Sequence, residues 1–136
     1  MSLTAVRAAL ETALNAMSPK IATAWENDEF TPPADTVPYQ AVNLLTARPD
    51  NQEIGRAYVE RGLMQVTLRY PLKKGPAAAV ARAEMLRATF FRGASFTASS
   101  VTSIIEQTPE IMPGFVDQNR WAVPVRIRFY AQVYPA

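Results

Sequence analysis

Four carboxylates near the start of the chain have the chemistry of a cation site. Oxygen ligands bind hard cations when several of them converge on one point. The spacing here lacks the Asp-x-Asp-x-Asp-Gly order of a calcium loop, and a solvated turn has the same composition. We therefore predict no metal site at these residues, which are Glu26, Asp28, Glu29 and Asp35.

The sequence lacks the residues on which most enzyme chemistry depends. It contains no histidine and no cysteine, which excludes imidazole acid–base catalysis, thiolate nucleophiles, zinc–thiolate sites and disulfides. Its five glycines are scattered, so there is no P-loop or dinucleotide-binding loop. Lys73-Lys74-Gly75 precedes a predicted helix, and a helix start can hold a phosphate, but nothing else supports a site there. We predict a protein that is not an enzyme and that uses no cofactor.

Basic side chains occupy outward positions of the predicted strands. Together with an aromatic residue, Tyr130, they are typical of platforms that bind single-stranded nucleic acid. The outward positions of a half-exposed strand must be polar in any case, and arginine suits them. We keep a small nucleic-acid-binding module as the alternative function, which depends on Arg69, Lys73, Arg120, Arg126 and Arg128.

Two connecting segments are candidates for contacts with other proteins. Residues 49–61 form a long polar connection, and loops of about a dozen residues in a compact domain are usually functional or mobile. Residues 109–119 are unusually apolar for a connector, and they either fold back on the core or anchor an interface. With two arginines of the last strand, these segments give the candidate interface residues Tyr58, Arg61, Ile111, Met112, Phe115, Arg126 and Arg128.

Charge is divided unequally along the chain. Residues 1–60 carry four basic and eight acidic side chains, whereas residues 61–136 carry ten basic and four acidic ones, giving −4 against +6. Opposite charges can steer a head-to-tail contact between identical subunits. Neutralisation within one folded chain explains the same pattern.

Hydrophobic periodicity predicts the elements that position these side chains. Residues 4–17 and 77–90 have apolar positions three and four apart, as in amphipathic helices. The expected buried positions are Val6, Leu10, Leu14 and Met17 in the first helix and Val80, Ala83, Leu86 and Phe90 in the second.

Strands are predicted at residues 37–48, 63–70, 101–107 and 121–133, with a further edge strand near Ile21. Residues 63–70 and 121–133 alternate apolar and polar side chains most clearly. We predict one α+β domain over residues 1–136, with a mainly antiparallel or mixed sheet of four to five strands and two helices packed on one face. No apolar run reaches the length of a membrane span and no secretory signal is visible, so we expect a cytoplasmic protein.

Short sequence fragments, in the same order over nearly the whole chain, resemble the phage tail terminator-like proteins of long-tailed phages and prophages. The fragments are Met17-Ser18-Pro19, Ile21-Ala22-Thr23-Ala24-Trp25-Glu26-Asn27, Phe30-Thr31-Pro32, Pro38-Tyr39-Gln40, Asn43-Leu44-Leu45, Tyr70-Pro71, Ala81-Arg82-Ala83-Glu84, Arg92-Gly93, Thr108-Pro109 and Pro124-Val125-Arg126-Ile127.

The resemblance implies a structural protein of the virion tail that is assembled in the cytoplasm of the bacterial host. Such a subunit forms a hexameric ring on the last ring of tail-tube protein, ends tube polymerisation and offers a surface for head joining. The expected partners are further copies of the chain, the tail-tube protein and a head–tail joining protein, and a dilute solution can hold the monomer. The family has no catalytic residues to transfer. Another neck subunit is the alternative within the same class.

Overall fold

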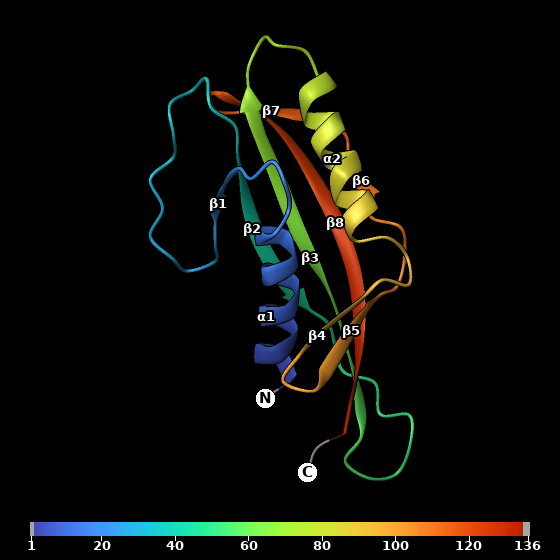
Figure 1. Ribbon diagram of the computed structural model, residues 1–136. Coiled ribbons are helices and arrows are strands. Elements are labelled where there is room, and N and C mark those ends of the chain that lie inside the picture. Colours follow the sequence, from blue (N-terminus) through green and yellow to red (C-terminus); the bar gives the residue numbers. More distant parts are fainter. Residues whose placement is uncertain (1, 135–136) are drawn as a thin grey trace.

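Two long strands form the centre of the structure, a computed structural model that describes residues 2–134. β3 (Tyr58–Pro71) and β8 (Arg120–Val133) run antiparallel and pair along their whole length, from Tyr58 opposite Val133 to Pro71 opposite Arg120. Their alternating side chains explain the pairing, because such strands bury one face and leave the other in water. Figure 1 shows them as the long axis of the molecule.

The sheet continues on both sides of this pair in the order β1-β2-β3-β8-β5-β4. β2 (Tyr39–Thr46) pairs antiparallel with β3, and β1 (Ala22–Ala24) adds a parallel edge strand. On the other side, β5 (Val101–Ile105) pairs with β8 and forms a hairpin with β4 (Ser95–Ala98). The predicted mixed, mainly antiparallel sheet and its edge strand near Ile21 are confirmed.

The number of strands was predicted wrongly, because the sheet has eight strands instead of four to five. Residues 109–119, expected as a loop, contain β6 (Glu110–Ile111) and β7 (Phe115–Asp117), and both pair with β8. One edge of β8 is therefore covered in succession by β7, β6 and β5. Strands of two or three residues are too short to show a period in the sequence.

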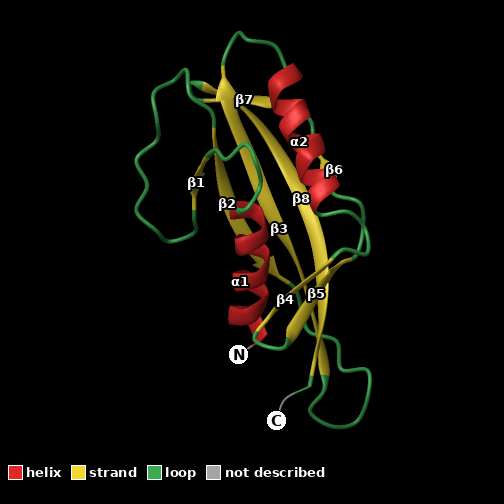
Figure 2. Cartoon of the chain, in the orientation of Figure 1, coloured by secondary structure: helices red, strands yellow, loops and turns green. Residues whose placement is uncertain are grey.

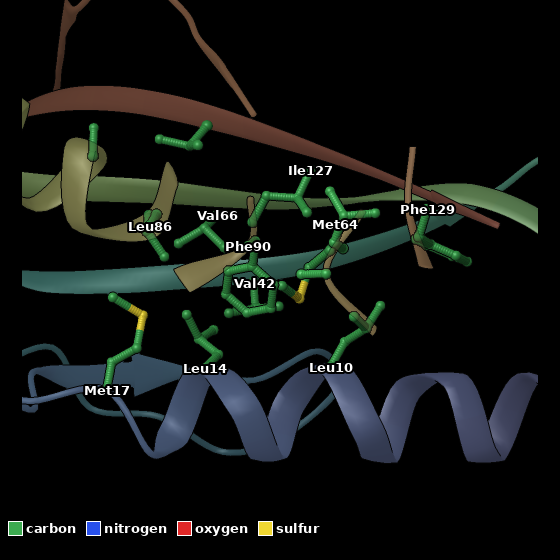
Figure 3. Packing of buried hydrophobic residues seen from close by; sticks show 14 of the residues in the cluster. Leu10, Leu14, Met17, Val42, Met64, Val66, Leu86, Phe90, Ile127 and Phe129 are labelled. Atoms are coloured by element: carbon green, nitrogen blue, oxygen red, sulfur yellow. The ribbon is translucent and has the colours of Figure 1, made fainter. Parts of the chain in front are cut away.

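Both helices, α1 (Ser2–Asn15) and α2 (Ala77–Thr89), lie on one face of the sheet, as predicted (Figure 2). They bury the side chains of a single core together with alternate residues of β2, β3 and β8, among them Val42, Met64, Val66 and Ile127 (Figure 3). The four core positions predicted for the first helix are all buried, although the last of them follows the end of α1; they are Val6, Leu10, Leu14 and Met17. Neither helix has the length and hydropathy needed to span a membrane within the described part of the chain.

Three of the four buried positions predicted for the second helix, Ala83, Leu86 and Phe90, are buried, and the prediction for Val80 was wrong. Ala79 is buried, whereas Val80 is 39% exposed. The buried face of α2 also includes Arg82, whose Nη1 donates a hydrogen bond to the backbone oxygen of Pro19. Burial lowers the pKa of Arg82 and raises the pKa of the neighbouring Tyr70. The small alanine side chains of α2 leave room for the guanidinium of Arg82, which contacts the segment between α1 and β1 at Pro19.

Candidate interaction surface

The face of the sheet opposite the helices carries most of the candidate interface residues. Directly opposed residues share a face, so the register places Leu45, Leu63 and Arg128 in one row and Asn43, Gln65 and Arg126 in the next. Arg61 and Tyr130 form the row on the other side of Leu63 and Arg128. No helix of the described residues covers this face (Figure 1), which leaves it available for contacts.

Arg61 is held by two carboxylates from distant parts of the chain. Its Nε lies 2.5 Å from Asp50 Oδ2, and its Nη1 donates to Glu106 Oε2. The guanidinium lies 5.8 Å from the ring centroid of Tyr130. The hydrogen bond that Arg61 donates to Asp50 raises the pKa of Arg61 above its ordinary value, and the negative charges of Asp50 and Glu106 act in the same direction. Arg61 therefore fixes the loop at residues 47–57 to the sheet.

A shallow depression of about 270 Å³ lies beside Arg61 and is called the Arg61 depression below. Gly62 of β3 is part of its lining, and the missing side chain lets Leu45 of β2 and Phe129 of β8 pack closely against β3. The lining combines apolar side chains with two arginines and one carboxylate. These residues are Leu45, Thr46, Ala47, Arg61, Gly62, Leu63, Glu106, Arg128 and Phe129.

The outer face is less basic than the sequence indicated. Arg61 is paired as described above, and Arg69 Nη2 lies 2.5 Å from Asp117 Oδ2. Among the described residues, Arg126 and Arg128 form no ion pair, and the buried Nε of Arg126 has no hydrogen-bond partner. A nucleic-acid platform needs a continuous positive surface, and two arginines do not provide one.

The apolar segment at residues 109–119 is divided between core and surface. Ile111 packs against the core, and the N–H of Met112 donates to the backbone oxygen of Pro124 over 2.9 Å. Phe115 and Val116 of β7 are 48% and 62% exposed. The fold-back interpretation is confirmed for Ile111, and the interface interpretation stays a prediction for Phe115, the exposed one among the predicted interface residues.

The structure brings only some of the predicted interface residues together. Arg61 and Arg128 share one depression, and Arg126 lies in the row next to that of Arg128. Tyr58 begins β3 at the far end of the sheet, although it and Arg61 were expected in a loop. Ile111, Met112 and Phe115 follow the other edge of β8.

The carboxylates near the start of the chain do not converge in the structure. Glu26 accepts hydrogen bonds from Arg7 and from the backbone of Leu44, and Asp28 accepts one from the N–H of Glu29. Asp35 accepts a bond of 2.5 Å from Asn119 Nδ2. Glu26, Asp28 and Asp35 thus have separate partners, and the part of the chain that the structure describes holds no group of acidic side chains placed to bind a metal ion.

Arg120 was predicted wrongly as an outward basic residue, because it is a buried anchor that holds the irregular segment before β2. Its guanidinium donates to the backbone oxygens of Pro33, Ala34 and Val37 and lies 4.9 Å from the ring centroid of Tyr39. Only 3% of Arg120 is exposed. The sequence contained no signal for this role, because the acceptors are backbone oxygens, which every type of residue has.

Comparison with known proteins shows which family model and which solved structure the chain is similar to. A family model described as "Phage tail terminator protein" matches residues 5–129. One solved structure is 26% identical, with a TM-score of 0.78, and the match covers 100% of this chain and 99% of that chain. No protein of curated function matches the chain.

Proposed function

The chain belongs to the phage tail terminator protein family, and from this membership we propose that it caps the tail tube. In this proposal the chain forms a ring, expected to be a hexamer, that ends tube polymerisation and offers a surface for head joining. The family match over residues 5–129 is the observation that carries the proposal. The family is one of structural tail proteins, and the chain is accordingly a phage tail protein.

Several surface features support a role in assembly. The outer face of the sheet is free of helices, and β7 exposes Phe115 and Val116. Exposed apolar side chains that lie together commonly mark association sites. The ion pair between Arg61 and Asp50 joins the two halves of opposite charge, and exposed charges such as Glu53, Lys73 and Lys74 take part in no ion pair among the described residues. These charges are available to steer identical subunits into a closed ring.

A ring of this kind ends a tube by having two different faces. One face copies the contact that a tube subunit offers, so that the ring binds the last tube ring. The other face lacks that contact and meets the head–tail joining protein instead. Assembly takes place in the host cytoplasm, and the product is part of the virion tail. In dilute solution the subunit can be monomeric until a tube end raises its local concentration.

Tube capping can be tested with purified tail-tube protein. We expect tubes polymerised in the presence of this chain to be shorter than tubes polymerised alone, with a ring at one end in negative-stain images. Substitution of the exposed Phe115 by Ser is expected to reduce capping at least tenfold. Phe91→Ser is the matched control, since Phe91 is similarly exposed at 57% and lies outside β7.

Unchanged tube lengths together with no binding to tube protein would contradict the proposal. Normal capping by the Phe115→Ser variant would leave the function standing and move the tube contact away from β7. Capture of joining protein by the ring without any effect on tubes would favour the alternative of another neck subunit.

A further inference from the structure

Ile54 is a fully exposed aliphatic side chain in the loop at residues 47–57, which joins β2 to β3. The neighbouring residues Asn51, Gln52, Glu53 and Arg56 are polar. Single exposed apolar residues are common on protein surfaces, so exposure alone assigns no role. Ile54 becomes informative because the opposite end of the molecule carries a cavity of matching character.

The cavity lies at the turn between β3 and α2, has a volume of about 200 Å³ and is called the Trp121 pocket below. Its walls are mostly apolar and come from a tight turn and from the start of β8. Lys73 and Gly75 both have positive φ, 62° and 75°, which closes the turn. The lining residues are Pro71, Leu72, Lys73, Gly75, Pro76 and Trp121.

The indole of Trp121 is fixed in this wall by the residues around it. A Cβ added to Gly114 would lie 2.4 Å from the indole ring, so the backbone of Gly114 packs directly against it. Val116 is paired with Trp121 across β7 and β8 and is 62% exposed. The exposed valine extends the apolar surface beyond the pocket.

The charges around the two features are complementary. Lys73 and Lys74 are exposed at the pocket, and Glu53 is exposed beside Ile54. Within residues 2–134, none of these three side chains takes part in an ion pair. An aliphatic side chain with a flanking carboxylate fits an apolar pocket with flanking lysines.

Ile54 cannot reach the pocket of its own chain. The loop precedes β3 and the pocket follows it, and the 14 residues of β3 separate them (Figure 1). An extended strand of that length spans about 45 Å at roughly 3.3 Å per residue. Only another molecule can bring the two features together, and a second copy of the chain carries both.

We propose that Ile54 of one subunit inserts into the Trp121 pocket of the next subunit, with Glu53 facing Lys73 and Lys74. The contact is heterologous, and such contacts produce rings when the rotation between subunits closes. The proposal rests on the ring of the proposed function and identifies its subunit contact.

The absence of cysteine from the sequence permits a direct test by cross-linking. The double variant Ile54→Cys with Leu72→Cys is mixed with tube protein and treated with an oxidant or a short thiol-reactive linker. We expect a ladder of linked species from dimer to the closed ring on a non-reducing gel. The control is Ile54→Cys with Phe91→Cys, which places the second thiol at an exposed residue outside the pocket and is expected to give no ladder.

A charge placed on Ile54 tests the same contact without a covalent bond. Ile54→Asp is expected to raise the concentration needed for ring assembly at least tenfold, and it will leave the thermal unfolding midpoint unchanged because Ile54 is fully exposed. Asn51→Asp adds the same charge in the same loop and is expected to have less than a threefold effect.

The outcomes separate this contact from the function on which it rests. Rings that cap tubes without a ladder, or with normal assembly of Ile54→Asp, would overturn the contact and leave the capping function intact. A failure to form rings or cap tubes by the unmodified chain would overturn both. A ladder that matches the control in intensity would show non-specific collision and would also overturn the contact.

Discussion

Gly62 of β3 lies where the strands β2, β3 and β8 pass close together. It is directly opposite Thr46 of β2 and Phe129 of β8, and a Cβ at this position would lie 2.5 Å from the backbone oxygen of Leu45 and 2.9 Å from the ring of Phe129. The first of these neighbours is backbone and cannot rotate away. A glycine is therefore required by close approach at this point.

We expect Gly62→Ala to destabilise the fold by roughly 1–3 kcal/mol, the usual cost of overpacking. Urea unfolding followed by tryptophan fluorescence would measure the change. Asn43→Ala, at an exposed position of β2, serves as the control and is expected to change stability by less than about 0.5 kcal/mol. Equal stability of the two variants would show that Leu45 of β2 and Phe129 of β8 can move away from β3 without cost.

At the scale of the elements, the sequence predicted the helices and strands that have a repeating pattern of buried residues. It missed the strands that are too short to have such a pattern. β3, β8 and α1 each extend over several periods of buried residues, so their faces were correct. β6 and β7 hold two and three residues and have no period. In α2 the alanines at residues 77–79 and 81 surround Val80, so the sequence did not show that Ala79 is buried there and Val80 is exposed.

The candidate interface could be predicted from the sequence only in part, for the same reason. The outward direction of Arg126 and Arg128 followed from alternation along β8. The partners of Arg61 did not, because Asp50 and Glu106 lie 11 and 45 residues away along the chain. The Trp121 pocket could not be predicted either, because its lining combines the turn at residues 71–76 with Trp121 of β8, which is distant in sequence.

Arg120 determines the order of a segment that has no regular structure of its own. Arg120→Met is expected to release residues 30–38, because three backbone oxygens lose a charged donor. Hydrogen bonds to charged groups contribute about 1.5–3 kcal/mol, so hydrogen exchange in this segment should accelerate at least tenfold. The amide of Val37, which bonds to Ala34, is the most direct reporter.

Arg128→Met on the same strand is the control for this experiment, and it should leave exchange at residues 30–38 unchanged. If exchange in the Arg120→Met variant stayed slow, the three prolines of the segment and the contact between Phe30 and Tyr39, with centroids 5.3 Å apart, would suffice to order it.

At the scale of the whole molecule, the missing histidine and cysteine determine how the protein responds to pH. Apart from the α-amino group, no group has an ordinary pKa between those of the carboxylates and those of lysine and tyrosine. The net charge of +2 therefore stays nearly constant across the neutral range. An assembly that is steered by opposite charges keeps the same steering at every pH in that range.

The stability of the fold should accordingly be flat near neutral pH and decline in alkali because of Tyr70. Burial raises the pKa of Tyr70 in the folded state, and the nearby Arg82 opposes the shift only in part. A raised pKa means that the folded state holds the proton more tightly. The contribution of Tyr70 to the stability of the fold is therefore complete below the unfolded pKa of about 10. This contribution is lost as the pH rises from there through the folded pKa.

Urea unfolding at several pH values would measure this decline, with Tyr70→Phe as the matched variant. Phe keeps the half-buried ring and removes the titrating hydroxyl, so the variant is expected to lose less stability above pH 10 than the parent does. Equal alkaline loss in both proteins would assign the decline to the lysines and to the other tyrosines. A decline that began near neutral pH would contradict the prediction, because within the chain only the α-amino group titrates there.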